Sequence, residues 1–246
     1  MTKILKYELR IILLKPYICA LTIVTLLYSY FILSTEIILG VSDTAPFSAW
    51  SFGKYMGDGA LVSLLVTLLI LAATFSERQK KVGVLTEVTG FSKKKMIITR
   101  SIIVGGYFLV SNILIFVMGC IFMKALFGEM YIGSYMIDFI FITIPCLFII
   151  LGPGNMLGSK KPVFIYIFMA LIFAAAFVLK EYSIDINGAN YFEIMSARLE
   201  ALKGGETQFV ISPGYVIKRS VYLAVGVVVL MINLMQTDRK KRLESE

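Results

Sequence analysis

The sequence predicts an all-helical integral membrane protein, on three observations. The chain of 246 residues is 58% hydrophobic and only 16% charged, whereas soluble domains carry roughly 25% charged residues. Its apolar residues gather in runs of about twenty, the length that an α-helix needs to cross about 30 Å of hydrocarbon. These runs are continuous and do not alternate with a period of two, which argues against a β-barrel.

Six runs predict a six-transmembrane-helix bundle that forms a single domain over residues 1–246. The expected bounds are Tyr17–Leu39, Gly57–Ser76, Met96–Phe122, Tyr135–Leu157, Pro162–Leu179 and Tyr215–Gln236. The first run exceeds the roughly 7–15 residues of a signal-peptide core and no small-residue cleavage site follows it, so we expect it to be retained. Pro145 and Pro153 predict a bend in the fourth run.

Basic residues predict which side of the membrane each loop faces. With a cytoplasmic N-terminus, 17 of the 24 Lys and Arg residues lie inside, clustered at 3–15, 78–100, 160–161 and 239–242. The others, which include Lys54, Lys218 and Arg219, lie outside. We therefore expect a multi-pass plasma-membrane protein with both termini in the cytoplasm. The net charge of +8 then indicates topology, and no nucleic acid is expected as a partner.

The residue types argue against most kinds of catalysis. The chain has no histidine, which removes imidazole metal ligands and Ser–His or Cys–His nucleophile pairs. Cys19, Cys120 and Cys146 all lie inside apolar runs without metal-ligand spacing. No G-x-x-x-x-G-K-[ST] phosphate-binding loop occurs. We expect a chain that is not an enzyme and that holds neither a metal nor a cofactor of its own.

The most informative segment is SERQKKVGVLTEVTGFSKKKM, residues 76–96, between the second and third runs. The seven basic residues of the cluster 78–100, six of them in this segment, would cost about 2.5 kcal/mol each at the bilayer centre, so the segment must lie in water or at the headgroups. Val82, Leu85 and Val88 recur every three residues, which predicts a short amphipathic helix. Gly90 can end this helix and Ser92 can cap the next one. A solvated basic loop that only fixes the topology is the alternative.

Part of this segment resembles a known family. The matching residues are Glu77-Arg78, Val82-Gly83-Val84-Leu85-Thr86-Glu87 and Gly90-Phe91-Ser92-Lys93. They are similar to the segment between the second and third spans of ATP-binding-cassette (ABC) permeases of type 2. That family shows an acidic/basic pair, a G-T-L-E-like stretch and a P-x-S-R-like corner. Chain length, six predicted spans and a long last outer loop also fit.

The resemblance implies a transport role. Residues 77–92 would be the coupling helix, which sits in a groove of a separate cytoplasmic ABC ATPase subunit that carries the ATP-Mg. Two permease subunits, identical or paralogous, would join two ATPases in an exporter. An ion-coupled secondary transporter is the alternative function. The residues expected to contact the ATPase are Arg78, Val82, Gly83, Leu85, Glu87, Val88 and Gly90.

Residues 1–16 predict an interfacial amphipathic helix, whose partner is membrane lipid. Lys3, Lys6 and Arg10 fall on one side of a helical wheel, opposite an apolar side, and Pro16 then bends the chain. The resembling family has such a helix near its ATPase. A basic flank that merely anchors the first span is equally compatible.

Two features on the outer side leave alternatives open. The loop 180–213 is rich in acids and contains a predicted helix, YFEIMSARLEALKGG, so it can form an acidic vestibule or a solvated cap. Glu36 and Asp138 are the only acids near the interior of a span. Such acids are candidates for function, but an interfacial position would explain them equally well.

Overall fold

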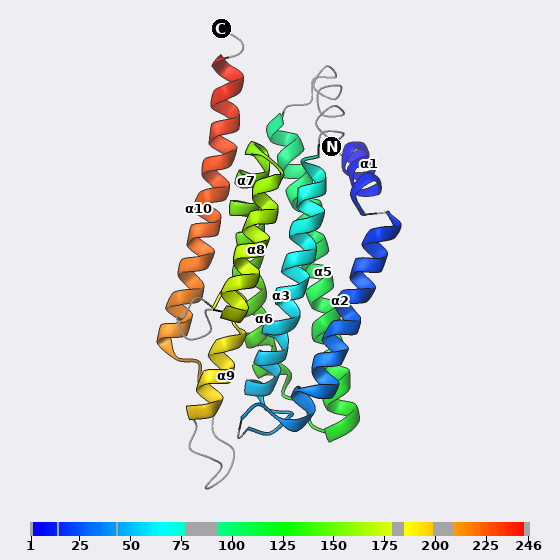
Figure 1. Cartoon of the computed structure of the whole chain (residues 1–246), viewed down its shortest axis with the longest axis vertical. Helices are drawn as coiled ribbons and strands as arrows, with labels where there is room; N and C mark the ends of the chain where they lie inside the picture. The colour runs from blue at the N-terminus through cyan, green and yellow to red at the C-terminus, as the bar shows by residue number, and fades with distance from the viewer. Residues whose placement is uncertain are drawn as a thin grey trace.

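The computed structural model describes residues 2–13, 15–42, 44–76, 93–178, 185–198 and 209–243. Within these ranges the chain is helical, without any β-strand, which confirms the predicted α-helical class. The long helices run side by side along an elongated bundle, and both termini lie toward the same end of it (Figure 1). We call this end the α1 end, and the opposite one the α9 end.

The order of the elements follows the predicted runs. They are α1 (Thr2–Leu13), α2 (Pro16–Thr35), the 3₁₀ turn η1 (Ile37–Leu39), α3 (Ala49–Thr74), α5 (Lys93–Phe127), α6 (Ile132–Ile149), the π-helical turn η2 (Ile150–Gly154), α7 (Asn155–Lys160), α8 (Val163–Val178), α9 (Ala189–Arg198) and α10 (Pro213–Leu243).

Five helical segments among the described residues are long and apolar enough to cross a membrane. They are Pro16–Leu39, Ala49–Thr74, Lys94–Phe127, Ile132–Lys160 and Pro213–Thr237. The chain is therefore a multi-pass α-helical membrane protein. Helix α8 matches the fifth predicted run, but at 16 residues it is shorter than the others, and the six-span count stays a prediction.

Helix α3 is the central element of the bundle. In its most apolar window 72% of the residues are buried, against 17% in α10, and it packs against α2, α5, α6, α8 and α9. Its Tyr55 is fully buried and donates its hydroxyl to the Ile115 carbonyl of α5 at 2.7 Å. A displacement of α3 would therefore disturb its packing against most of the other helices.

Helix α3 begins at Ala49, eight residues before the predicted start of the second span at Gly57. Ser48 caps the helix by accepting a hydrogen bond from the Ser51 amide at 3.2 Å. Further along, Lys54 and Asp58 form an ion pair of 2.8 Å across one helical turn, so these polar residues do not interrupt the helix. Hydropathy marks only the apolar part of such a helix.

The fourth predicted span is irregular where its prolines lie. Pro145 is inside α6, and Pro153 lies in η2, where the α-helical hydrogen bonds give way to a π-helical turn. At Gly152 this turn lies directly against α10, since a Cβ there would overlap the Gly226 carbonyl oxygen. The prolines thus belong to a close helix contact.

Substitution of Gly57 tests the contact between α3 and α9. A Cβ at Gly57 would lie 2.7 Å from the Ala189 backbone, whereas at Gly106, within α5, it would meet nothing within 4 Å. Gly57→Ala should therefore lower the unfolding free energy in detergent by about 1–3 kcal/mol. Gly106→Ala should leave it unchanged or raise it by up to about 1 kcal/mol. Equal effects of the two substitutions on an SDS unfolding titration would contradict this contact.

Candidate functional site

The seven residues predicted to contact an ATPase all lie outside the described residues. Arg78, Val82, Gly83, Leu85, Glu87, Val88 and Gly90 belong to the segment 77–92. The structure describes both flanks of this segment, which are the C-terminal end of α3 and the start of α5. Both flanks lie at the α1 end of the bundle, beside α1 (Figure 1).

One buried side chain joins the elements around these flanks. Arg100, on α5, is only 5% exposed. Its Nε donates to Oε2 of Glu8 on α1 at 3.2 Å, and its Nη2 donates to Oε1 of the same carboxylate at 3.4 Å. Its Nη1 donates to the Thr74 carbonyl, at the end of α3, at 2.9 Å. We call this arrangement the Arg100 junction, after Arg100, Glu8 and Thr74.

In the Arg100 junction, the guanidinium compensates both the buried charge of Glu8 and the unpaired carbonyl of Thr74. Glu8 is 4% exposed, so its carboxylate requires a cation to offset the loss of hydration. Two parallel hydrogen bonds from a guanidinium meet this need with a fixed geometry. Thr74 lies in the last turn of α3, where carbonyls lack a donor within the helix and favour positive charge. Arg100 therefore holds α1, α3 and α5 together.

Sequence reasoning does not predict this junction. Arg100 is one of seven basic residues in the cluster 78–100, and nothing in the sequence pairs it with Glu8. One signal was present, because Glu8 is the only acid in α1 and falls on the apolar side of its helical wheel. An acid on an apolar face is expected to have a buried partner. The sequence does not show which base that partner is.

A second buried arginine organises the α9 end. Arg219, counted above only among the outer charges, lies on α10 and is 1% exposed. Its Nε donates to the Phe141 carbonyl of α6 at 2.7 Å, which has no helical donor because residue 145 is proline. The same guanidinium donates to the carbonyls of Ile142, Asp185 and Ile186 at 2.9, 3.2 and 2.7 Å.

The described part of the loop 180–213 covers the end of α3. Asp185 accepts hydrogen bonds from the amides of Gly188 and Tyr191, both at 2.8 Å, at the start of α9. Glu193 of α9 pairs with Lys54 of α3 at 3.1 Å. Helix α9 follows the prediction for YFEIMSARLEALKGG over its described part, and these contacts favour the cap.

An open cavity of about 270 Å³ lies next to this cap. Its lining includes Glu36, Lys54 and Glu193, so carboxylates outnumber bases in it. This cavity corresponds to the acidic vestibule that the sequence analysis gave as the alternative to a cap. Asp138 does not line this cavity. It is fully buried, and neither of its carboxylate oxygens has a hydrogen-bond partner among the described residues.

Comparisons with known proteins identify no relative, since no family model, no curated protein and no solved structure matches the chain. Among the described residues, no group of three or more Cys, Asp or Glu side chains could hold a metal ion. The Arg100 junction is the candidate functional site because it adjoins the segment that the sequence singled out.

Removal of Glu8 tests the energetics of the Arg100 junction. Glu8→Ala would remove the buried carboxylate that accepts two of the Arg100 hydrogen bonds and should cost about 3–5 kcal/mol of unfolding free energy. Glu8→Gln keeps one acceptor and should cost less. Arg10→Ala, on the exposed side of the same helix, should stay within about 0.5 kcal/mol. An SDS unfolding titration that gave Glu8→Ala and Arg10→Ala the same cost would rule out a buried pair.

A double substitution tests the role of Arg219. Arg219→Met leaves several buried carbonyls unpaired and should destabilise the protein by several kcal/mol. Pro145→Ala restores an amide to residue 145, which can then bond the Phe141 carbonyl. The cost of Arg219→Met should therefore be smaller in the Pro145→Ala background than in the parent protein, by about 1 kcal/mol. Strictly additive costs would mean that the two residues do not share this acceptor.

Proposed function

We propose that the chain is the membrane-spanning permease subunit of an ABC exporter, driven by a separate ATPase subunit. The observation that carries the proposal is the Arg100 junction next to the flanks of 77–92. A segment that receives force from a motor needs firm attachment at both of its ends. Arg100 connects these two ends to each other, because it lies on α5 and bonds the last turn of α3.

The distribution of charge supports a cytoplasmic position for 77–92. At the α1 end the described exposed bases include Lys6, Arg10, Lys95, Lys160 and Lys161. The only acid with a described side chain at this end is Glu8, which is turned inward to Arg100. A basic end of this kind faces the cytoplasm in most membrane proteins. Both termini would then be cytoplasmic.

The path from the segment to the outer side would run along α3. In the proposed exporter an ATPase grips Val82, Leu85 and Val88 and moves the segment when it closes on ATP. This movement enters α3 at its last turn, where Arg100 ties it to α1 and α5. At its other end α3 meets α9 through Lys54, which pairs with Glu193. The permease itself performs no chemistry.

A second copy of the chain, or a paralogue, would complete the transport pathway. The apolar residues exposed on the outer surface of α10 include Ile217, Val221 and Val228, and they suit either lipid or another permease. The acidic cavity beside α9 would open to the outer side.

An ion-coupled secondary transporter remains the second candidate because of Asp138. A buried carboxyl without a partner in a membrane protein is a recognised feature of proton- and ion-coupled transport. The two functions differ in their energy source. Transport in proteoliposomes should require an ATPase subunit and ATP in the first case, and an ion gradient alone in the second.

The proposal predicts that an ATPase subunit co-purifies with the chain. The triple variant Val82→Asp, Leu85→Asp, Val88→Asp should lose this subunit and its substrate-stimulated ATPase activity, because it puts charge on the apolar face that would enter the groove. Membrane insertion should persist. Val210→Asp, a substitution at an exposed position near the α9 end, is the control and should retain both. Retention of a coupled ATPase by the triple variant would refute the proposal.

A further inference from the structure

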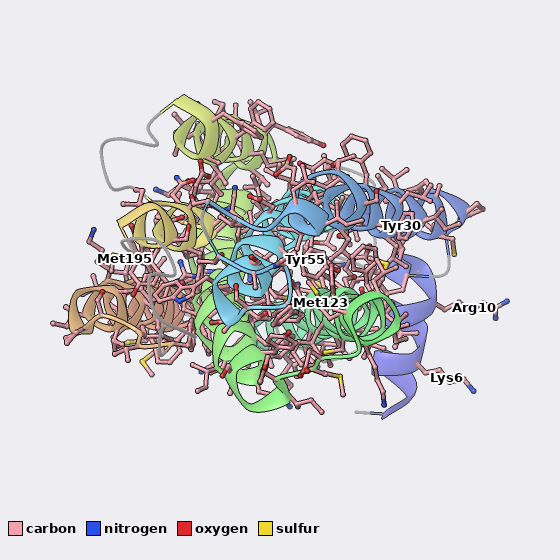
Figure 2. The ribbon with its side chains drawn as sticks, turned by 90° about the horizontal axis from the view of Figure 1, so that it is seen from below. Lys6, Arg10, Tyr30, Tyr55, Met123 and Met195 are labelled. Atoms are coloured by element: carbon pink, nitrogen blue, oxygen red, sulfur yellow. The ribbon has the colours of Figure 1, made fainter. Side chains whose placement is uncertain are left out.

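The outward side of α1 carries positive charge that no acid of the described residues neutralises. Lys6 and Arg10 are exposed and extend away from the bundle, one helical turn apart (Figure 2). The single acid of α1, Glu8, points the opposite way and is bound by Arg100. The helix therefore has a neutralised inner side and a cationic outer side.

The rest of the molecule shows the same separation of charge along its long axis. Apart from Glu8, the acids whose side chains the structure describes belong to the α9 half of the bundle: Glu36, Asp58, Glu129, Asp138, Asp185 and Glu193. No described acid therefore competes for the cations of α1. Among the described side chains, none would repel an anion that approaches Lys6 and Arg10 from outside the chain.

The position of α1 along the bundle fits the headgroup layer of a membrane. Helix α1 ends at Leu13, and the candidate span Pro16–Leu39 begins three residues later. Tyr17 is 43% exposed, and the Lys15 ammonium lies 5.7 Å from the centroid of its ring. Tyrosine and lysine side chains at the end of a span are typical of the membrane–water interface.

An apolar side chain beside the two cations favours lipid over a soluble acidic protein. Leu9, next to Arg10, is 39% exposed, whereas Ile12, further along the helix, is buried in the core. A helix with exposed leucine among cations suits the boundary between headgroups and acyl chains. We infer that Lys6 and Arg10 bind the headgroups of anionic phospholipids.

This inference does not depend on the proposed transport function. It adds a chemical preference, for negatively charged lipid, to the interfacial position expected of residues 1–16. A cation next to an anionic membrane surface contributes about 1 kcal/mol, which corresponds to about a fivefold change in association.

The test measures which lipid the whole protein retains. Purified, delipidated protein in detergent is incubated with dioleoyl phosphatidylglycerol or with dioleoyl phosphatidylcholine, and bound lipid is counted by native mass spectrometry. The wild type should retain phosphatidylglycerol in excess. The double variant Lys6→Gln, Arg10→Gln should lose this excess by about fivefold for each of the two charges removed. Raising the salt to about 1 M should weaken the preference in the wild type.

A matched control removes the same charge at the other end. Lys124→Gln, Lys218→Gln also replaces two exposed bases, near the α9 end, and should retain phosphatidylglycerol like the wild type. An unchanged preference in the Lys6/Arg10 variant, or an equal loss in both variants, would overturn the inference. The inference would also be overturned if the Lys6/Arg10 variant lost an acidic protein partner while its retention of phosphatidylglycerol was unchanged.

Discussion

The Arg100 junction is the interaction on which the account of this molecule depends. A guanidinium buried in a membrane protein must satisfy its donors from within the structure, and Arg100 does so from two other helices. The Glu8 carboxylate fixes the N-terminal helix, and the Thr74 carbonyl fixes the end of the central helix. Removal of Arg100 would take this donor away from the buried Glu8 carboxylate and from the Thr74 carbonyl. This constraint makes α1, α3 and α5 one unit at the α1 end.

The α9 end is built on the same principle with different partners. Arg219 donates mainly to main-chain carbonyls. One of them, the Phe141 carbonyl, lacks a helical donor because residue 145 is proline. The proline in α6 thus provides an acceptor for the buried arginine of α10, and the arginine provides the donor that the α6 backbone lacks. Between the two ends, α3 supplies a mostly buried rod that contacts nearly every other long helix. Such an arrangement can pass a displacement from one end to the other.

The sequence predicted the fold class and the position of most helices, because both follow from hydropathy. It missed the start of α3, where polar Lys54 and Asp58 pair with each other across a helical turn. The burial of Arg100 and Arg219 could not be predicted, because the sequence does not show whether an arginine faces water or a carbonyl of another helix. Their partners are distant along the chain and, for Arg219, are mostly backbone carbonyls. The predicted contact residues of 77–92 stay a prediction, since they lie outside the described residues.

The most direct measurement of the central claim is site-specific photo-crosslinking at position 85. A photoreactive amino acid replaces Leu85 in the full chain, and cells are irradiated before the membranes are extracted. We expect a covalent adduct with a protein that carries a nucleotide-binding ATPase domain. We expect no such adduct when the photoreactive group is moved to position 210, at the α9 end. Adducts at position 85 with lipid alone, or with no ATPase, would contradict the account.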